Sequence, residues 1–125
     1  MSGPALVNAR TETVVASDVE VAATRASRRR GLLGRDSLDG SAALILSPCW
    51  TIHTAFMRFP IDVAFVDRDG RVVRVAEDMA PWRVAAAPAA SVTVELAAGV
   101  LRARDVQVGD QLYLSTPSGN RLGLS

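Results

Sequence analysis

The segment that most constrains the fold runs from Ile61 to Asp78 and reads IDVAFVDRDGRVVRVAED. Two runs rich in β-branched residues, which favour strands, flank an acidic turn. Glycine at position 70 suits the left-handed backbone that tight turns between antiparallel strands require. The segment therefore predicts a β-hairpin with Asp67 to Gly70 in its turn.

Further strand patterns precede and follow this hairpin. Val14 to Ala23 alternates apolar and polar residues with a period of two, which predicts a half-buried strand. The continuous apolar run AALILS at 42–47, stopped by Pro48, predicts a buried strand. The segments SVTVEL at 91–96 and QLYLS at 111–115 predict two more strands.

Helical patterns are few and short. Residues 24–34 predict a helix of about two turns. Thr24 or Ser27 can cap its N-terminus, and Gly31 and Gly34 favour its end. Residues 96–104 are ambiguous, because Gly99 interrupts a segment that could otherwise form a helical turn or two.

Many short strands without regular strand–helix alternation predict an α+β, mainly β fold. We expect a single compact domain, mostly an antiparallel barrel-like or sandwich-like sheet with one or two short helices. A chain of 125 residues is the size of one domain. We place it at residues 5–115, with flexible termini at 1–4 and 116–125, where small and polar residues show no period.

Composition excludes several function classes. All 14 basic residues are arginine, which excludes a lysine Schiff base or a phosphate-loop lysine. A net charge of +1 makes nucleic acid a poor partner. A single cysteine forms no internal disulfide, and no apolar run has the length of a membrane span. We expect a soluble, cytoplasmic monomer without a membrane partner or a cofactor.

The only cysteine, Cys49, and the only histidine, His53, invite the hypothesis of a thiolate nucleophile. Residues four apart on a strand lie about 13 Å from each other, beyond hydrogen-bond reach. Pro48 and the branched residues between Cys49 and His53 favour extended backbone, so the alternative of a buried, inert cysteine is preferred.

A metal site has few ligands to draw on. Beyond one histidine and one cysteine, it would need carboxylates such as Asp62, Glu77 or Asp78. The acidic turn does not fit a calcium loop, because the EF-hand register would place Phe65 and Ala76 at ligand positions. We therefore predict no metal.

The segment IHTAFMRFPID, from Ile52 to Asp62, predicts a bend, because Pro60 restricts the residue before it. Its polar and apolar side chains form a candidate pocket for a small ligand or a peptide. The predicted binding residues are His53, Thr54, Met57, Arg58 and Asp62.

Two alternatives to this pocket remain open. In the first, Asp62 pairs with Arg58 or His53 and simply locks the bend. In the second, His53, Asp62 and Thr54 form a small hydrolase-like site, with Cys49 as a further member. No nucleophile elbow or glycine-rich phosphate loop supports an enzyme, so a non-enzymatic binding or accessory module is preferred.

Five motifs in order, RRRGLLGRDSL, IHTAFMRFPIDVAFVDRDGRVV, Pro81, VELAAG and VGDQL, together resemble DUF192, a family of uncharacterised bacterial and archaeal domains. The resemblance covers about residues 24–112. It implies a mainly β fold and a bacterial source, and no established enzymatic activity. The residues on motif positions are Gly31, His53, Thr54, Met57, Pro60, Asp62, Asp67, Gly70, Glu95, Gly99, Gly109 and Asp110. Many members look exported, whereas this chain shows no leader, so their compartment is not carried over.

Overall fold

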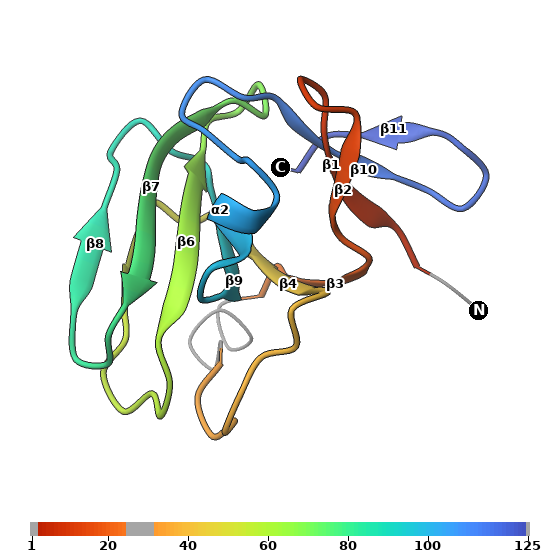
Figure 1. Cartoon of the computed structure of the whole chain (residues 1–125). Coiled ribbons are helices and arrows are strands. Elements are labelled where there is room, and N and C mark those ends of the chain that lie inside the picture. The colour runs from red at the N-terminus through yellow and green to blue at the C-terminus, as the bar shows by residue number, and fades with distance from the viewer. Residues whose placement is uncertain (1–2, 25–31, 125) are drawn as a thin grey trace.

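The computed structural model describes residues 3–24 and 32–124, and the elements within them are shown in Figure 1. In chain order they are β1 (Ala5–Asn8), β2 (Thr13–Ala16), β3 (Asp18–Ala22), β4 (Ala42–Leu46), β5 (Thr51–His53), β6 (Ile61–Val66), β7 (Val72–Met79), β8 (Val84–Ala86), β9 (Val92–Ala97), α2 (Val100–Ala103), β10 (Leu112–Ser115) and β11 (Arg121–Leu122).

The strands form three layers. The central sheet has the order β3-β4-β9-β6-β7, and only its β3–β4 pair is parallel. A four-stranded sheet, β11-β10-β1-β2, packs on one face, and a two-stranded ribbon, β5–β8, packs on the other. The predicted mainly β, mostly antiparallel, sandwich-like fold is confirmed, and the ribbon adds a third layer that the sequence did not indicate.

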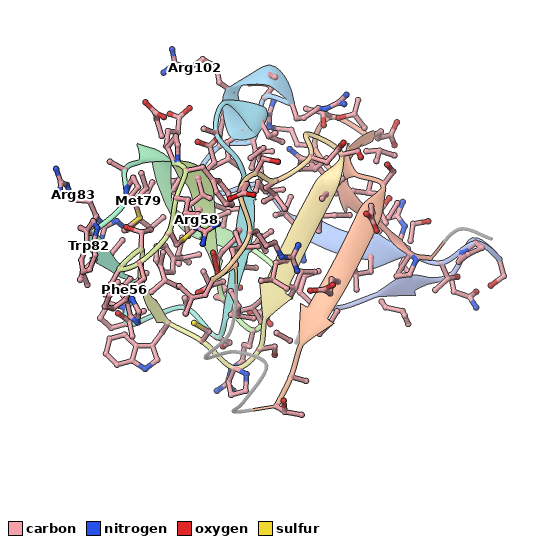
Figure 2. The ribbon with its side chains drawn as sticks, turned by 90° about the horizontal axis from the view of Figure 1, so that it is seen from below. Phe56, Arg58, Met79, Trp82, Arg83 and Arg102 are labelled. Atoms are coloured by element: carbon pink, nitrogen blue, oxygen red, sulfur yellow. The ribbon has the colours of Figure 1, made fainter. Side chains whose placement is uncertain are left out.

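The ribbon ends in two turns, one between β5 and β6 and one between β7 and β8. Ile52 and Ala85, a cross-strand pair, point from the ribbon into the core. The two turns carry Phe56 and Trp82, which lie side by side at one edge of the molecule (Figure 2). The ribbon therefore anchors one face in the core and brings two aromatic side chains together at the surface.

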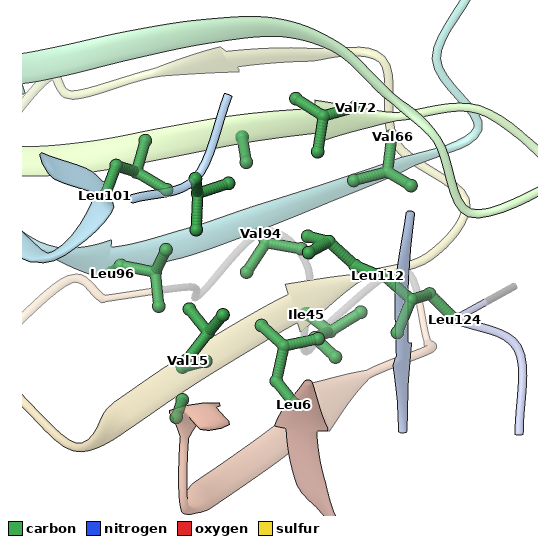
Figure 3. Packing of buried hydrophobic residues seen from close by; sticks show 14 of the residues in the cluster. Leu6, Val15, Ile45, Val66, Val72, Val94, Leu96, Leu101, Leu112 and Leu124 are labelled. Carbon is green, nitrogen blue, oxygen red and sulfur yellow. The ribbon is translucent and has the colours of Figure 1, made fainter. Parts of the chain in front are cut away.

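The central sheet separates two apolar cores. Because side chains alternate along a strand, Ala64 and Val66 of β6 face one core, whereas Val63 and Phe65 face the other. The first core contains Leu6, Ile45, Val94 and Leu112, drawn from both sheets (Figure 3). The second core lies between the central sheet and the ribbon. A β6 side chain therefore lies either on the side of the four-stranded sheet or on the side of the ribbon.

The predicted hairpin is confirmed as β6–β7, with Gly70 in its turn at φ 86°. A β-carbon on Gly70 would lie 2.7 Å from the carbonyl oxygen of Leu112. The Leu112 N–H donates to the Gly70 carbonyl oxygen at 2.8 Å, so the turn is tied to the segment that begins β10. Position 70 therefore requires glycine for its conformation and for the close approach of another strand.

We expect Gly70→Ala to lower the free energy of unfolding by roughly 2 kcal/mol or more, from the left-handed backbone and the steric clash together. Denaturant unfolding measures the loss. Gly119→Ala is the matched control, because Gly119 has a φ of 91° but no neighbouring atom within 4 Å of the added carbon. Equal losses at the two positions would mean that the contact with Leu112 contributes nothing.

The prediction of one strand from Val14 to Ala23 is wrong. The chain forms β2 and β3, which belong to different sheets. The N–H groups of Ser17 and Asp18 both donate to the Ser41 carbonyl oxygen, at 2.9 and 3.0 Å, and this contact marks the passage from one sheet to the next. Ser17 and Asp18, two polar residues in succession, interrupt the apolar–polar alternation at the junction.

The remaining expectations concern helices and chain ends. Most of the predicted helix at 24–34 lies outside the described residues, and 96–104 contains α2 as one helical turn. The expectation that 116–125 lies outside the domain does not match the described part of that segment. There β11 pairs with β10, and Leu124 is buried in the first core. No helix among the described residues is long and apolar enough to cross a membrane.

Candidate functional site

Thr54 joins the two turns at the end of the ribbon. Its buried hydroxyl donates to the Ala80 carbonyl oxygen at 2.7 Å and accepts from the Arg83 N–H at 2.8 Å. Its own N–H donates to the Arg83 carbonyl oxygen at 2.8 Å, and its carbonyl oxygen accepts from the Trp82 N–H at 3.0 Å. One residue thus fixes the position of each turn relative to the other.

We expect Thr54→Val to lower the free energy of unfolding by about 1–3 kcal/mol, because two partly buried hydrogen bonds of the hydroxyl are lost while the side-chain shape is kept. Thr54→Ser retains the hydroxyl and should cost less than Thr54→Val. Hydrogen exchange at the Trp82 amide should also accelerate in Thr54→Val. Equal stability of the valine variant and the native protein would contradict this role.

Phe56 and Trp82 have left-handed backbone conformations, with φ of 64° and 66°, which bulky residues rarely adopt. Their side chains are 71% and 61% exposed, and the ring centroids lie 4.6 Å apart with the ring planes at 60°. Val84, which follows Trp82 by two residues, is 75% exposed. We name Phe56, Trp82 and Val84 the aromatic ridge. Adjacent exposed apolar side chains of this kind mark interaction surfaces.

Positive charge borders the ridge. Arg83 is exposed, and its Nη1 donates only to the neighbouring Trp82 carbonyl oxygen, at 3.3 Å, among the described residues. Arg58 forms an exposed ion pair with Asp36 at 2.7 Å. Neither turn segment, 49–60 or 80–90, contains an acidic residue. The ridge therefore combines apolar surface with an arginine that has no carboxylate partner in the described chain.

The predicted site residues do not form one cluster. His53 is exposed on the ribbon opposite Val84, and Met57 is buried in the second core. Arg58 points to Asp36 rather than to Asp62. The structure thus brings His53 and Thr54 to the ridge, places Met57 beneath the surface, and leaves Arg58 in a separate ion pair.

Asp62 is fully buried and lies on the other face of the central sheet. Its Oδ1 accepts from the Asp78 N–H at 2.8 Å, and its Oδ2 accepts from the N–H groups of Gly99 and Leu101, both at 3.0 Å. The hypothesis that Asp62 pairs with Arg58 or His53 is wrong. Alternation along β6 turns Asp62 to the same face as Ala64, whereas the ribbon covers the opposite face.

This arrangement also separates the residues of the hydrolase hypothesis. The Asp62 carboxylate holds β7 and the start of α2, and the Thr54 hydroxyl is bonded to backbone groups of the second turn. The Cys49 thiol donates to the carbonyl oxygen of Thr51, the first residue of β5, at 3.1 Å. Neither the Asp62 carboxylate nor the Cys49 thiol therefore forms a hydrogen bond with His53.

A cavity of about 570 Å³ lies beside Asp62. Its lining includes Glu77, Asp78 and Arg102, and Glu77 and Arg102 form an ion pair at 3.5 Å. No residue of the aromatic ridge lines it, and Figure 2 shows Arg102 apart from Phe56 and Trp82. Within residues 3–24 and 32–124, no three histidine, cysteine or acidic side chains converge as a metal site would require.

Glu95 is a buried carboxyl group on the face of the central sheet that borders the second core. It lies on β9 between Leu44 and Val63 of the adjacent strands, and only 6% of it is exposed. Burial raises the pKa of Glu95 to about 7, against the opposing effect of the Arg35 charge. Glu95 therefore changes charge near neutral pH at the border of the second core.

Sequence reasoning missed the aromatic ridge. Phe56 lies within the segment that we identified as a bend, and Trp82 follows Pro81, yet neither was a predicted site residue. Aromatic residues make up only 5% of the chain, so two that lie exposed in neighbouring turns are notable. The residue types alone could not show their exposure, because lone aromatic residues are more often found inside.

Comparison with known proteins identifies the fold and the family. The chain has 20% identity to a protein of Sinorhizobium meliloti 1021, described as a candidate transcription regulator, over 89% of this chain and 91% of that one, with a TM-score of 0.76. It has 23% identity to a protein of unknown function from Novosphingobium aromaticivorans, over 88% of this chain and 82% of that one, with a TM-score of 0.74. At these identities the two structures show a shared fold alone.

No curated protein of established annotation matches the chain. A family model does match, over residues 6–114, which contain the ribbon, both turns, Asp62 and Glu95. Its description is DUF192, "Uncharacterized ACR". The expected resemblance is thereby confirmed over nearly the whole chain, and the protein belongs to the DUF192 family.

Proposed function

We propose that this protein is a binding module for other proteins and that the aromatic ridge is its contact surface. The observation that carries the proposal is the exposure of Phe56 and Trp82 on left-handed backbone, at turns that Thr54 holds together. Such backbone costs about 1 kcal/mol or more for each bulky residue, and rings that are mostly exposed bury little apolar surface in return. A function for the exposed rings accounts for this cost.

A protein fits the ridge better than other partners do. Trp, Phe and Arg are enriched at the centres of protein interfaces. The two rings pack edge to face rather than presenting one flat stacking surface for bases. Arg83 beside the ridge and a net charge of +1 provide little electrostatic attraction for an anionic membrane or for nucleic acid.

A small molecule is also less suited to this surface. Small-molecule sites are concave and enclose most of the ligand. The ridge projects from two turns, and the cavity beside Asp62 includes none of its residues. Of the predicted binding residues, the proposal keeps only Thr54, as the residue that holds the two turns together, and the centre of the proposed surface is formed by Phe56 and Trp82.

The test is selection of a display library of random peptides on the native protein, followed by affinity measurements on variants. Phe56→Asn and Trp82→Asn remove the rings while asparagine tolerates the left-handed backbone. We expect each variant to weaken the selected peptides at least tenfold and to retain or increase stability. Hot-spot truncations commonly have effects of this size.

Val108→Ser is the matched control, because Val108 is 59% exposed, close to the exposure of Trp82, and is not part of the ridge. Its peptide affinity should stay within twofold of the native value. Failure to enrich any peptide, or selected peptides that bind both asparagine variants as well as the native protein, would overturn the proposal. Preferential binding to vesicles or to glycans through Trp82 would overturn it as well.

A further inference from the structure

The hydrogen bonds of the ribbon determine which backbone groups point outward. The Thr54 N–H donates to the Arg83 carbonyl oxygen, and the Ala87 N–H donates to the Trp50 carbonyl oxygen, each at 2.8 Å. In an antiparallel ladder, hydrogen-bonded pairs alternate with pairs that do not bond. Thr54–Arg83 and Trp50–Ala87 are bonded pairs, and the alternation makes Ile52–Ala85, midway between them, a bonded pair too. The His53–Val84 pair is therefore non-bonded. The N–H and C=O groups of Val84 therefore point away from β5, along the free edge of β8.

The β8 edge is open at its first residue. Among the described residues, the backbone groups of Val84 have no partner beyond the ribbon. At the other end of β8, the Ala86 carbonyl oxygen accepts from Arg74 Nη1 at 2.5 Å. A side chain thus covers one acceptor of this edge, whereas the groups beside Trp82 remain available. Open edges are templates on which another chain can pair.

We propose that the β8 edge binds an extended segment of a partner protein as an added strand, with the aromatic ridge anchoring its side chains. This inference rests on the proposed function and specifies its mode. Strand addition uses main-chain hydrogen bonds for affinity and alternate side chains for specificity. Here Val84 offers one donor and one acceptor, Ala86 offers a further N–H, and Trp82 with Phe56 offers an apolar anchor directly before them.

Charge defines the chemistry of the segment. Arg83 lies between the aromatic anchor and the open edge, and no acidic residue occurs in 49–60 or 80–90. An acidic side chain on the segment can therefore pair with Arg83 without repulsion from these two turns. The expected occupant is an extended peptide that carries an apolar residue for the ridge and an aspartate or glutamate close to it.

The β8 edge, rather than the β5 edge, is assigned because Val84 is 75% exposed and directly follows the Trp82 turn. On β5, His53 is the equivalent non-bonded residue, and its N–H also points outward. Proline at either position removes one outward donor and no bond of the ribbon, and proline is tolerated at such edge positions. The two positions therefore form a matched pair for an experiment.

The experiment measures the affinity of the best peptide selected above for Val84→Pro and for His53→Pro. We expect Val84→Pro to raise the Kd about tenfold or more, since it removes a hydrogen bond and crowds the edge. His53→Pro, which alters the opposite edge of the ribbon, should raise the Kd much less than Val84→Pro. Val84→Thr, which keeps the N–H, should lose less affinity than Val84→Pro.

Two further measurements use the native protein and do not depend on how the proline variants fold. Hydrogen exchange at the Val84 and Ala86 amides should slow when the peptide binds. Methylation of successive peptide nitrogens should weaken binding at every second position, as expected for a strand.

The outcomes separate this inference from the proposed function. Peptides that need Trp82 but bind Val84→Pro normally and leave the Val84 amide unprotected would overturn strand addition and keep the protein-binding function. Loss of binding in His53→Pro alone would place the strand on β5 and overturn the assignment. Self-association of the native protein that Val84→Pro abolishes would identify a second copy as the occupant and also overturn it. Absence of any enriched peptide would instead count against the function itself.

Discussion

Replacing Asp62 by alanine is expected to lower the free energy of unfolding by roughly 3 kcal/mol or more, because three backbone N–H groups lose a carboxylate acceptor at once. The carboxylate is fully buried and accepts from three backbone N–H groups, those of Asp78, Gly99 and Leu101. Alanine leaves the buried Leu101 N–H and the partly buried N–H groups of Asp78 and Gly99 without this acceptor, and a buried donor left unpaired costs about 1–3 kcal/mol. The connection between β6, β7 and α2 should weaken as a result.

Denaturant unfolding of Asp62→Ala and Asp62→Asn tests this role. Asparagine keeps one acceptor but places an NH₂ group against a backbone donor, so it should also destabilise. The matched control is Asp67→Ala, because Asp67 accepts from the N–H groups of Asp69 and Arg71 in the exposed hairpin turn. That change should cost about 1 kcal/mol. An Asp62→Asn protein as stable as the native one, yet defective in a hydrolysis reaction, would revive the enzyme hypothesis.

The second large effect is a pH-dependent loss of stability caused by Glu95. The pKa of this group is raised from 4.5 to about 7 on folding, chiefly by burial. Below pH 4.5 both the folded and the unfolded chain carry the neutral acid, so Glu95 has no pH-dependent effect there. Between pH 4.5 and about 7 the unfolded chain releases its proton while the folded chain retains it, and the free energy of unfolding falls as pH rises.

Above about pH 7 both states are ionised and the loss is complete, at roughly 3 kcal/mol from this residue. Glu95→Gln, which mimics the neutral acid, should remove this decline. We expect the glutamine variant to be more stable than the native protein by roughly 3 kcal/mol at pH 8 and to be similar to it at pH 4.5.

Unfolding curves at several pH values for both proteins measure the difference. Glu12→Gln is the control, because Glu12 is exposed and its replacement should leave the pH dependence unchanged. If Glu95→Gln is no more stable than the native protein at pH 8, the Glu95 carboxylate has a compensating partner when ionised, and burial does not destabilise it.

Local patterns predicted the elements whose residues interact with near neighbours. The β6–β7 hairpin was recognisable because its two strands and its Gly70 turn are contiguous, and the buried run of β4 was recognisable from its apolar residues. Short elements were missed. The three-residue strands β5 and β8 show no alternation long enough to detect, and they are stabilised by pairing across about thirty residues of chain.

The candidate site depended even more on distant contacts. The segment around the bend was correctly singled out, but its members separate, because Asp62 follows the alternation of β6 to one face and His53 lies on a ribbon over the other. Phe56 and Trp82 are 26 residues apart, and their rings meet because β5 pairs with β8 and Thr54 bonds to the second turn. No periodic pattern in the sequence predicts this contact between the two rings.

The sequence by itself determined the family, the mainly β class, the single domain and the hairpin, because these depend on composition, motif order and alternation over a few residues. The tertiary structure alone decided the role of each polar side chain. Burial and hydrogen-bond partners depend on which sheet face a residue occupies and on what covers that face. For this reason Asp62 is a buried link between strands and helix, while the exposed Phe56 and Trp82 form the surface that we propose binds a partner.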